Sequence, residues 1–320
     1  MKLLRYVAAA ILLGVAVSAQ AAFPDKPIKI IVGFPPGGPL DTHARLLVDQ
    51  LQKHLGQSVI VDYKPGAGGS IGADFVSKSP ADGYTLLMAN TGTMVINPFV
   101  YTKNAYETLR DFTPIARTAQ QPLALVVNND VPAKTFAEFV AYAKKNPGKV
   151  NYGSAGNGGI SHLVPEMLQD ATGIQMVHVP YKGTAPAFVD LLAGQVQFMA
   201  ESIPQVSQYL KAGKVRALAM TGRERNNAIA DVPTMAEAGV KDFEVVGFYG
   251  VLAPPKLPAD VAAKLSDAFR QALANEEVRT RMIQQGADPA YMDSAQFSAF
   301  LKTEGARWQS AVKKAGVKLD

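Results

Sequence analysis

"GFPPGG" at Gly33–Gly38 and "GSAGNGG" at Gly153–Gly159 are two glycine-rich turns that lie far apart in one chain. Each follows a short apolar run and precedes a stretch with helical spacing of apolar residues. Strand, turn and helix in this order are the unit of an open parallel sheet, whose ligands bind beyond the carboxyl ends of the strands. The first amides of a helix have no internal partners and favour a negative charge. The two turns therefore predict two α/β units that face each other across an anion-binding cleft.

The alternation of strands and helices supports two such units. In the first unit, strands are expected at 28–34, 58–63 and 84–90, with helices at 37–56 and 68–79. Extended chain at 112–119 and 123–129 leads to the second unit, with helices at 136–148, 160–173, 185–194 and 206–213 and strands at 150–155, 176–181, 196–201 and 215–220. A strand at 244–254 precedes three helices at 258–274, 276–285 and 294–315. The predicted fold is α/β, with an open, mostly parallel sheet flanked by helices in each half.

The first residues have the pattern of a cleaved signal peptide. Two cations precede the apolar run Tyr6–Val17, and "AQA" at Ala19–Ala21 has the small residues that signal peptidase accepts. The run is shorter than the roughly 20 residues of a membrane-spanning helix. We expect cleavage after Ala21 and a periplasmic protein.

The composition of the mature chain excludes several classes of protein. Removing residues 1–21 from 320 leaves 299 residues, and the loss of Lys2 and Arg5 lowers the formal charge from +5 to +3. Because no basic cluster interleaved with aromatic residues occurs, we expect no nucleic-acid partner. The chain has no cysteine, so it folds without disulfides or thiolate metal sites.

Sequence motifs of enzymes and nucleotide-binding proteins are missing. Neither glycine-rich turn satisfies G-x-G-x-x-G, and no P-loop occurs. Ser154 and Ser161 each lack one glycine of the nucleophile elbow G-x-S-x-G. His43, His54 and His162 have no histidine four residues away, and neither does His178, as a helical zinc site would need. We expect His43 and His54 on the surface or at the end of a helix, and we predict no enzyme activity, no metal and no cofactor.

The order of several motifs resembles the Bug receptors, the extracytoplasmic solute-binding proteins of tripartite tricarboxylate transporters. The resemblance covers nearly the whole mature chain and is carried by the stretches at 23–47, 56–90, 150–163, 179–199, 215–222 with 231–239, and 247–255. It implies a two-lobed periplasmic binding protein of type II topology that closes over a small organic anion. Residues 22–122 and 246–320 would form the first lobe and 123–245 the second, with hinges near Arg117–Val127 and Glu244–Leu252. The implied partners are a small organic acid and membrane transporter subunits, with the receptor itself a monomer.

Carried over by motif, the resemblance also implies the ligand contacts. In the first lobe these are Pro36, Gly37, Gly38, Asp41, Asn90 and Thr91. In the second lobe they fall in the segments Ser154–Asn157, Gly159–His162 and Tyr181–Thr184, and comprise Ser154, Ala155, Gly156, Asn157, Gly159, Ser161, His162, Tyr181, Lys182, Gly183 and Thr184.

Most of these residues also have a purely structural interpretation. The two glycines of the first turn either bind the ligand or only permit the turn, and Asp41 either caps a helix or orients pocket water. Ser154 and Ser161 are helix caps or ligand donors. Lys182 is an ion-pair partner or a solvated cation, and His162 contacts the cleft or packs in the lobe.

"MAESIP" departs from the family pattern, because Ala200 stands where an aromatic residue is common. Glu201 and Ser202 follow at the end of the same predicted strand and are expected at the ligand. An inward-pointing Glu201 would repel a second ligand carboxylate unless protonated, and would favour an amine or hydroxyl at that end. Phe248 similarly replaces a common tryptophan.

Two other functions remain open at this stage. A sensor partner would present the loaded lobes to a sensor kinase ectodomain, and a secreted enzyme would use the same scaffold for chemistry. The sequence favours a transport receptor over both.

Overall fold

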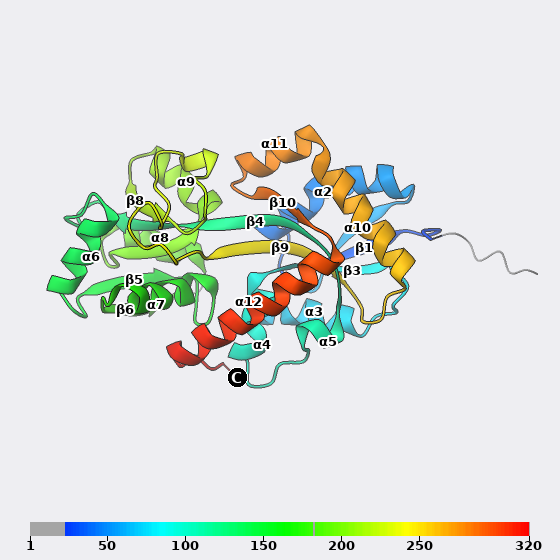
Figure 1. Ribbon diagram of the computed structural model, residues 1–320, viewed down its shortest axis with the longest axis horizontal. Coiled ribbons are helices and arrows are strands. Elements are labelled where there is room, and N and C mark those ends of the chain that lie inside the picture. Colours follow the sequence, from blue (N-terminus) through cyan, green and yellow to red (C-terminus); the bar gives the residue numbers. More distant parts are fainter. Residues whose placement is uncertain (1–22, 182, 320) are drawn as a thin grey trace, which may run out of the picture.

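The computed structural model describes residues 23–181 and 183–319. The predicted signal peptide and the predicted contact Lys182 lie outside these described residues. Figure 1 shows two α/β halves placed end to end, with the long strand β4 (Thr113–Asn128) running from one half into the other. Among the described residues no helix is long and apolar enough to cross a bilayer.

Parallel strands form the centre of the first half. β1 (Ile28–Val32) pairs with β2 (Val59–Tyr63) on one side and with β3 (Thr85–Asn90) on the other. β9 (Val246–Ala253), the start of β4, and β10 (Asp288–Met292) continue this sheet in antiparallel orientation. The helical segments of this half are α2 (Pro39–Leu55), η1 (Ala67–Gly69), α3 (Ser70–Ser77), η2 (Gly92–Ile96), α4 (Asn97–Val100), α5 (Thr108–Asp111), α10 (Ala259–Ala274), α11 (Glu276–Gln284) and α12 (Ser294–Ala315).

The second half repeats this plan. β5 (Val150–Ser154) pairs in parallel with β6 (Met176–Pro180) and β7 (Phe198–Ser202). The end of β4 lies antiparallel between β7 and β8 (Val215–Met220). The helical segments here are α6 (Phe136–Lys145), α7 (Ile160–Thr172), α8 (Thr184–Leu192), α9 (Ile203–Lys211) and η3 (Asn227–Ile229).

The two glycine-rich turns end in the same way. Gly38 and Gly159 are the N-caps of α2 and α7, and both have extended backbones and no side-chain cap. The helices stop at Gly56 and Gly173, which adopt the left-handed conformation that glycine tolerates best. In each unit, therefore, the sequence builds a buried strand, an uncapped helix start and a glycine stop.

One sheet runs through both halves at β4. Its residues pair with β9 as far as Pro122, and with β7 from Leu123 onward. Two segments, β4 and β9 with the preceding Val245, pass between the halves and are the crossing strands. The fully buried Thr221 bonds to both: its hydroxyl accepts from the Leu123 amide at 2.9 Å and donates to the Val245 carbonyl. This buried side chain, together with the Thr221 backbone, bonds to both segments that pass between the halves.

The structure corrects several elements expected from the sequence. The extended segments at 112–119 and 123–129 form one continuous strand, β4, because Gln120–Pro122 stays paired with β9. β10, α4 and α5 were not expected. The three C-terminal helices are confirmed as α10, α11 and α12.

The C-terminal helix α12 extends along both halves (Figure 1). It packs on β4 and η2 in the first half and on α7 in the second. Near its end, Lys314 Nζ lies 3.0 Å from the Asp170 carboxylate of α7. The last helix is therefore a third connection between the halves, besides β4 and β9.

Candidate functional site

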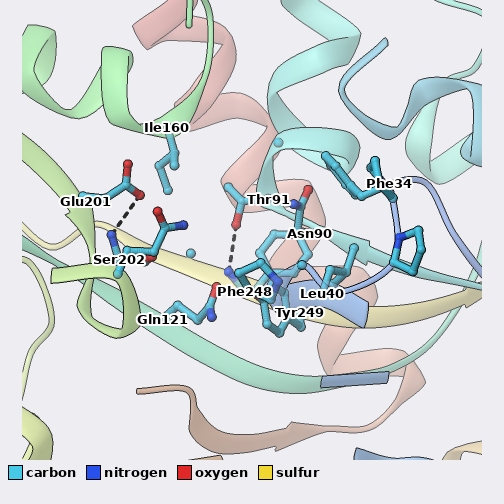
Figure 2. Close-up of a pocket in the computed structure, with 17 residues that line it drawn as sticks. Phe34, Leu40, Asn90, Thr91, Gln121, Ile160, Glu201, Ser202, Phe248 and Tyr249 are labelled. Atoms are coloured by element: carbon cyan, nitrogen blue, oxygen red, sulfur yellow. Dashed lines mark hydrogen bonds between the residues drawn. The ribbon is translucent and has the colours of Figure 1, made fainter. Parts of the chain in front are cut away.

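A cavity of about 490 Å³ lies where the two halves meet. Figure 2 shows Phe34 and Leu40 on one side of it and Glu201 and Ser202 on the other. The lining residues come from both halves and are Phe34, Pro35, Pro36, Gly38, Pro39, Leu40, Asn90, Thr91, Gly92, Gln121, Ile160, Glu201, Ser202, Gln205, Gly247, Phe248 and Tyr249.

The first wall is the turn before α2. Pro39 at the first helical position has no N–H, and the N-cap Gly38 offers no side chain, so the helix start is open toward the cavity. The Asp41 carboxylate holds the turn from behind: it accepts from the Gly37 amide at 2.7 Å and from the Tyr63 hydroxyl at 2.7 Å. Burial favours a higher pKa for Asp41, but these bonds and the Arg45 charge outweigh it and lower the pKa. Asp41 is a structural anchor of the turn and does not line the cavity.

The end of β3 supplies two polar side chains. The Asn90 Oδ1 accepts from the amide and the hydroxyl of Thr93, both at 3.0 Å, so its amide hydrogens are left for a ligand. The Thr91 hydroxyl accepts from the Phe248 amide at 2.8 Å and keeps its own hydrogen to donate (Figure 2). Both predicted residues therefore lie at the cavity with donor capacity.

The floor is formed by the crossing strands. Gly247 lies where a Cβ would come within 3.6 Å of both the Ile160 Cδ1 and the Thr91 Oγ1, so a side chain here would fill the space between the halves. Burial raises the pKa of Tyr249 to about 12; a hydrogen bond with Gln121 lowers it in part, and the Glu201 charge adds to the rise. Gln121, Tyr249 and Glu201 thus share one electrostatic environment.

The second wall comes from the β7–α9 junction. Glu201 is buried; its Oε1 accepts from the Ser202 amide at 3.0 Å and its Oε2 from the Thr184 hydroxyl at 3.2 Å. Burial raises the pKa of this carboxyl, and hydrogen bonds from the Ser202 amide, the Thr184 hydroxyl and the Ser202 hydroxyl counter part of the rise. Ser202 is the N-cap of α9 and makes no side-chain cap, and Gln205 lies one residue past Pro204 in the first turn. Ile160, the first residue of α7, completes this wall.

The second glycine-rich turn does not line this cavity. Gly158 packs instead against α4, where a Cβ would lie 2.7 Å from Val100. Ser154 is fully buried and its Oγ lies 2.6 Å from the Nε2 of His178. Ser161 Oγ accepts from the Ala155 amide at 3.0 Å. The predicted residues that the structure does not bring to the cavity lining from this segment are Ser154, Ala155, Gly156, Asn157, Gly159, Ser161 and His162.

His162 is held inside the second half. Its ring stacks on that of His178 with centroids 3.7 Å apart, and its Nδ1 accepts from the Gly158 amide at 3.0 Å. Burial lowers the pKa of His162, although the nearby Glu166 opposes the shift, and burial together with the His162 charge lowers that of His178 to about 4. Of the two interpretations of His162, packing inside the lobe is therefore the one that describes its position.

The remaining predicted residues of the second lobe lie outside the lining of the main cavity. The Tyr181 hydroxyl donates to Asp190 at 2.6 Å, Gly183 is the N-cap of α8, and Thr184 reaches the site only through Glu201. Gly37 lines a neighbouring cavity of about 320 Å³. Of the predicted set, the residues that do line the main cavity are Pro36, Gly38, Asn90, Thr91, Glu201 and Ser202.

Several lining residues were not predicted. Gln121, Gly247, Phe248 and Tyr249 belong to the crossing strands, which the sequence placed at the hinge but not at the ligand. Gln205 carries no motif. A signal was available for Gly247, because a glycine inside a β-strand pattern often marks a close approach of other groups.

The charge of the cavity is unusual for an anion site. Its lining residues within the described chain include no Lys, Arg or His, and Glu201 is the charged member. Across residues 23–181 and 183–319, no cluster of three or more His, Cys, Asp or Glu could hold a metal ion. His43, expected at a helix surface, is instead buried, with its Nε2 2.8 Å from the Thr118 hydroxyl.

The fold and the interlobe cavity define a two-lobed binding protein of the periplasmic type, and similar solved structures are periplasmic binding proteins. Residues 43–317 match the tripartite tricarboxylate transporter family receptor, and the chain belongs to this family of solute-binding receptors. This confirms the resemblance seen in the sequence. The protein BugT of Bordetella pertussis is 36% identical over 308 residues, which cover 96% of this chain and 94% of BugT.

Two similar solved structures name a ligand. Rpa4515 of R. palustris, solved with adipate, has a TM-score of 0.81 and 33% identity, covering 92% of this chain and 99% of its own. MatC of Rhodopseudomonas palustris, with bound malate, has a TM-score of 0.76 and 33% identity, covering 91% and 100%.

Proposed function

We propose that this chain is a periplasmic receptor that captures a small carboxylate-bearing organic solute between its lobes and delivers it to tripartite tricarboxylate-type membrane subunits. The observation that carries the proposal is the interlobe cavity, which is lined by Gly38 at the uncapped start of α2 and by Ser202 at the uncapped start of α9. Each start has amides without internal partners and a fraction of a positive charge. A carboxylate is stabilised there without a cationic side chain.

The first lobe offers the more complete carboxylate site. The start of α2 lies beside Asn90, whose Nδ2 hydrogens are available, and Thr91, whose hydroxyl hydrogen is available. A buried carboxylate needs several such charge-assisted hydrogen bonds to replace its hydration. We therefore place the ligand carboxylate at Gly38, Asn90 and Thr91.

We propose that residues 22–122 and 246–320 form one lobe and 123–245 the other, closing on the ligand by a hinge at the crossing strands. The change of β4 partner between Pro122 and Leu123, and the Thr221 link between the crossing segments, support this division. A ligand that contacts both lobes stabilises the closed form, because its contacts are complete only there.

Membership of the receptor family supports delivery to a transporter. Adipate and malate in two similar structures support a carboxylate as the cargo. A catalytic function is less well supported: the Ser154–His178 pair has the atoms of a nucleophile and a base, but Ser154 is fully buried and does not line the cavity.

Thermal-shift screening of the purified mature protein against a library of organic acids tests the proposal. We expect at least one carboxylate to raise the melting temperature and to bind with a Kd in the micromolar range, about −8 kcal/mol, by calorimetry. The bound acid should be recovered unchanged. Failure of every carboxylate to bind, or its conversion to a product, would refute a binding receptor.

Transport is tested by coupling the receptor to its membrane subunits. Uptake of the identified acid should require both the receptor and the membrane subunits. A ligand-dependent complex with sensor domains alone, and uptake that is unchanged without the receptor, would favour the sensor function over transport.

A further inference from the structure

Glu201 is the charged side chain in the lining of the interlobe cavity, and it is 5% exposed. It closes the end of the cavity opposite the turn before α2 (Figure 2). Any ligand that reaches from the start of α2 to the second lobe therefore ends near a buried carboxyl group.

The hydrogen bonds that the protein gives to Glu201 come from the Ser202 amide, the Thr184 hydroxyl and the Ser202 hydroxyl. The Ser202 amide can only donate, and it does so to Oε1; the Thr184 hydroxyl donates to Oε2. A carboxylate accepts about four hydrogen bonds, so these three protein donors leave it acceptor capacity. The Glu201 carboxylate can therefore accept a further hydrogen bond from a ligand.

No cation balances Glu201 within residues 23–181 and 183–319, where no ion pair includes it. The polar groups around it are neutral: Gln121 from β4, Tyr249 from β9, Gln205 from α9, and the Thr184 and Ser202 donors. A buried charge without a partner is unfavourable, and a ligand cation or donor would relieve it.

We propose that Glu201 makes the receptor selective for solutes with a carboxylate at one end and a hydrogen-bond donor, an ammonium or a hydroxyl, at the other, in preference to dicarboxylates. The inference rests on the proposed function and narrows its ligand class. The carboxylate lies at the uncapped start of α2, and the donor lies against Glu201. A second carboxylate at that position would meet a like charge.

This selectivity would distinguish the chain from the two similar structures that hold adipate and malate, both of which are dicarboxylates. An ammonium should be favoured over a hydroxyl, since it neutralises the buried charge as well as donating to it. The alternative is a protonated Glu201 that donates to a second ligand carboxylate, and the experiment separates the two.

Calorimetry with matched ligands tests the proposal. The probes are three sets of equal carbon number: malonate, β-hydroxypropionate and β-alanine; succinate, γ-hydroxybutyrate and γ-aminobutyrate; glutarate, δ-hydroxyvalerate and δ-aminovalerate. They are titrated into the wild-type protein, Glu201→Gln and Glu201→Asp. Glu224→Gln makes the same chemical change at an exposed position and serves as the matched control.

In the best-binding set we expect the amino or hydroxy acid to bind the wild type about 10- to 100-fold more tightly than the diacid. Glu201→Gln should reduce this ratio to within about threefold, while Glu201→Asp and Glu224→Gln keep the preference. Unchanged melting temperatures would show that the variants fold.

A diacid that binds the wild type as tightly as its amino and hydroxy counterparts, with uptake of one proton on binding, would overturn the proposal in favour of a protonated Glu201. A preference that survives in Glu201→Gln would overturn the role of this residue. In both cases carboxylate binding itself would stand. If no acid of the organic-acid library binds, the proposed function fails, and this inference fails with it.

Discussion

Thr91→Val tests the carboxylate site at the first lobe with little change of shape. Thr91 is 3% exposed and lines the cavity, and its hydroxyl accepts from the Phe248 amide at 2.8 Å, which leaves its own hydrogen to donate. Valine keeps the branched outline but has neither the donor nor the acceptor. The substitution should therefore weaken ligand binding and, independently, destabilise the unliganded protein.

The two effects are of similar size and are measured separately. Loss of one hydrogen bond to a charged ligand costs about 1.5 to 3 kcal/mol, which raises Kd roughly 10- to 150-fold. The Phe248 amide, left buried without an acceptor, lowers the free energy of unfolding by about 1 to 3 kcal/mol. Thr91→Ser keeps the hydroxyl and should lose less in both measurements.

Calorimetry with the tightest-binding acid gives the first quantity, and urea unfolding without ligand gives the second. The reasoning is refuted if Thr91→Val binds the acid as tightly as the wild type. A loss of stability without a loss of affinity would show that Thr91 only supports Phe248, and would remove it from the ligand site.

Gly247→Val should abolish detectable binding by filling the space next to Ile160, while the unliganded fold survives; tight binding by this variant would contradict the cavity's assignment as the ligand site. The pKa of His43 is lowered by burial to about 3 and that of His178 to about 4, so both are neutral in the folded protein. Since the unfolded chain takes up these protons near pH 6.5, the free energy of unfolding should be full above that pH and fall toward pH 4 by about 1.4 kcal/mol per pH unit for each histidine. Urea unfolding between pH 7 and pH 4 measures this fall, and a free energy that does not change with pH would contradict the prediction. Thr221→Val removes the hydroxyl that bonds to the Leu123 amide and the Val245 carbonyl, and should cost about 2 kcal/mol or more in the same assay, whereas Thr221→Ser should cost much less; equal effects would argue against the hydrogen-bonded link.

Local pattern was sufficient for most of the fold. β1 and β5 are short apolar strands, and α2 and α7 begin after glycine-rich turns and end at left-handed glycines, as their spacing indicates. Local pattern failed at β4, where "QQP" at Gln120–Pro122 resembles a break in the strand. The pairing of these residues with β9, which is distant in sequence, keeps the chain extended.

The candidate site was less predictable than the fold. Asn90, Thr91 and Glu201 lie at the carboxyl ends of β3 and β7, which are generic binding positions in α/β sheets. Ser154 lies at the same end of β5 and His162 lies in the first turn of α7, yet they bond to His178 and to Gly158 inside the lobe. No local signal distinguishes a polar residue that faces a cavity from one that meets a polar partner across a strand.

The sequence by itself determined the class of the protein, since its motifs and their order specify two α/β units, each with a glycine-rich turn between strand and helix. Only the tertiary structure decided which groups surround the cavity: the crossing strands bring Gln121 and Gly247 to its floor, and the second glycine-rich turn packs on Val100 instead. The physical reason is range. Strand and helix patterns depend on neighbours a few residues away, whereas the direction of Glu201 into the cavity depends on contacts between segments that meet only when the lobes are assembled.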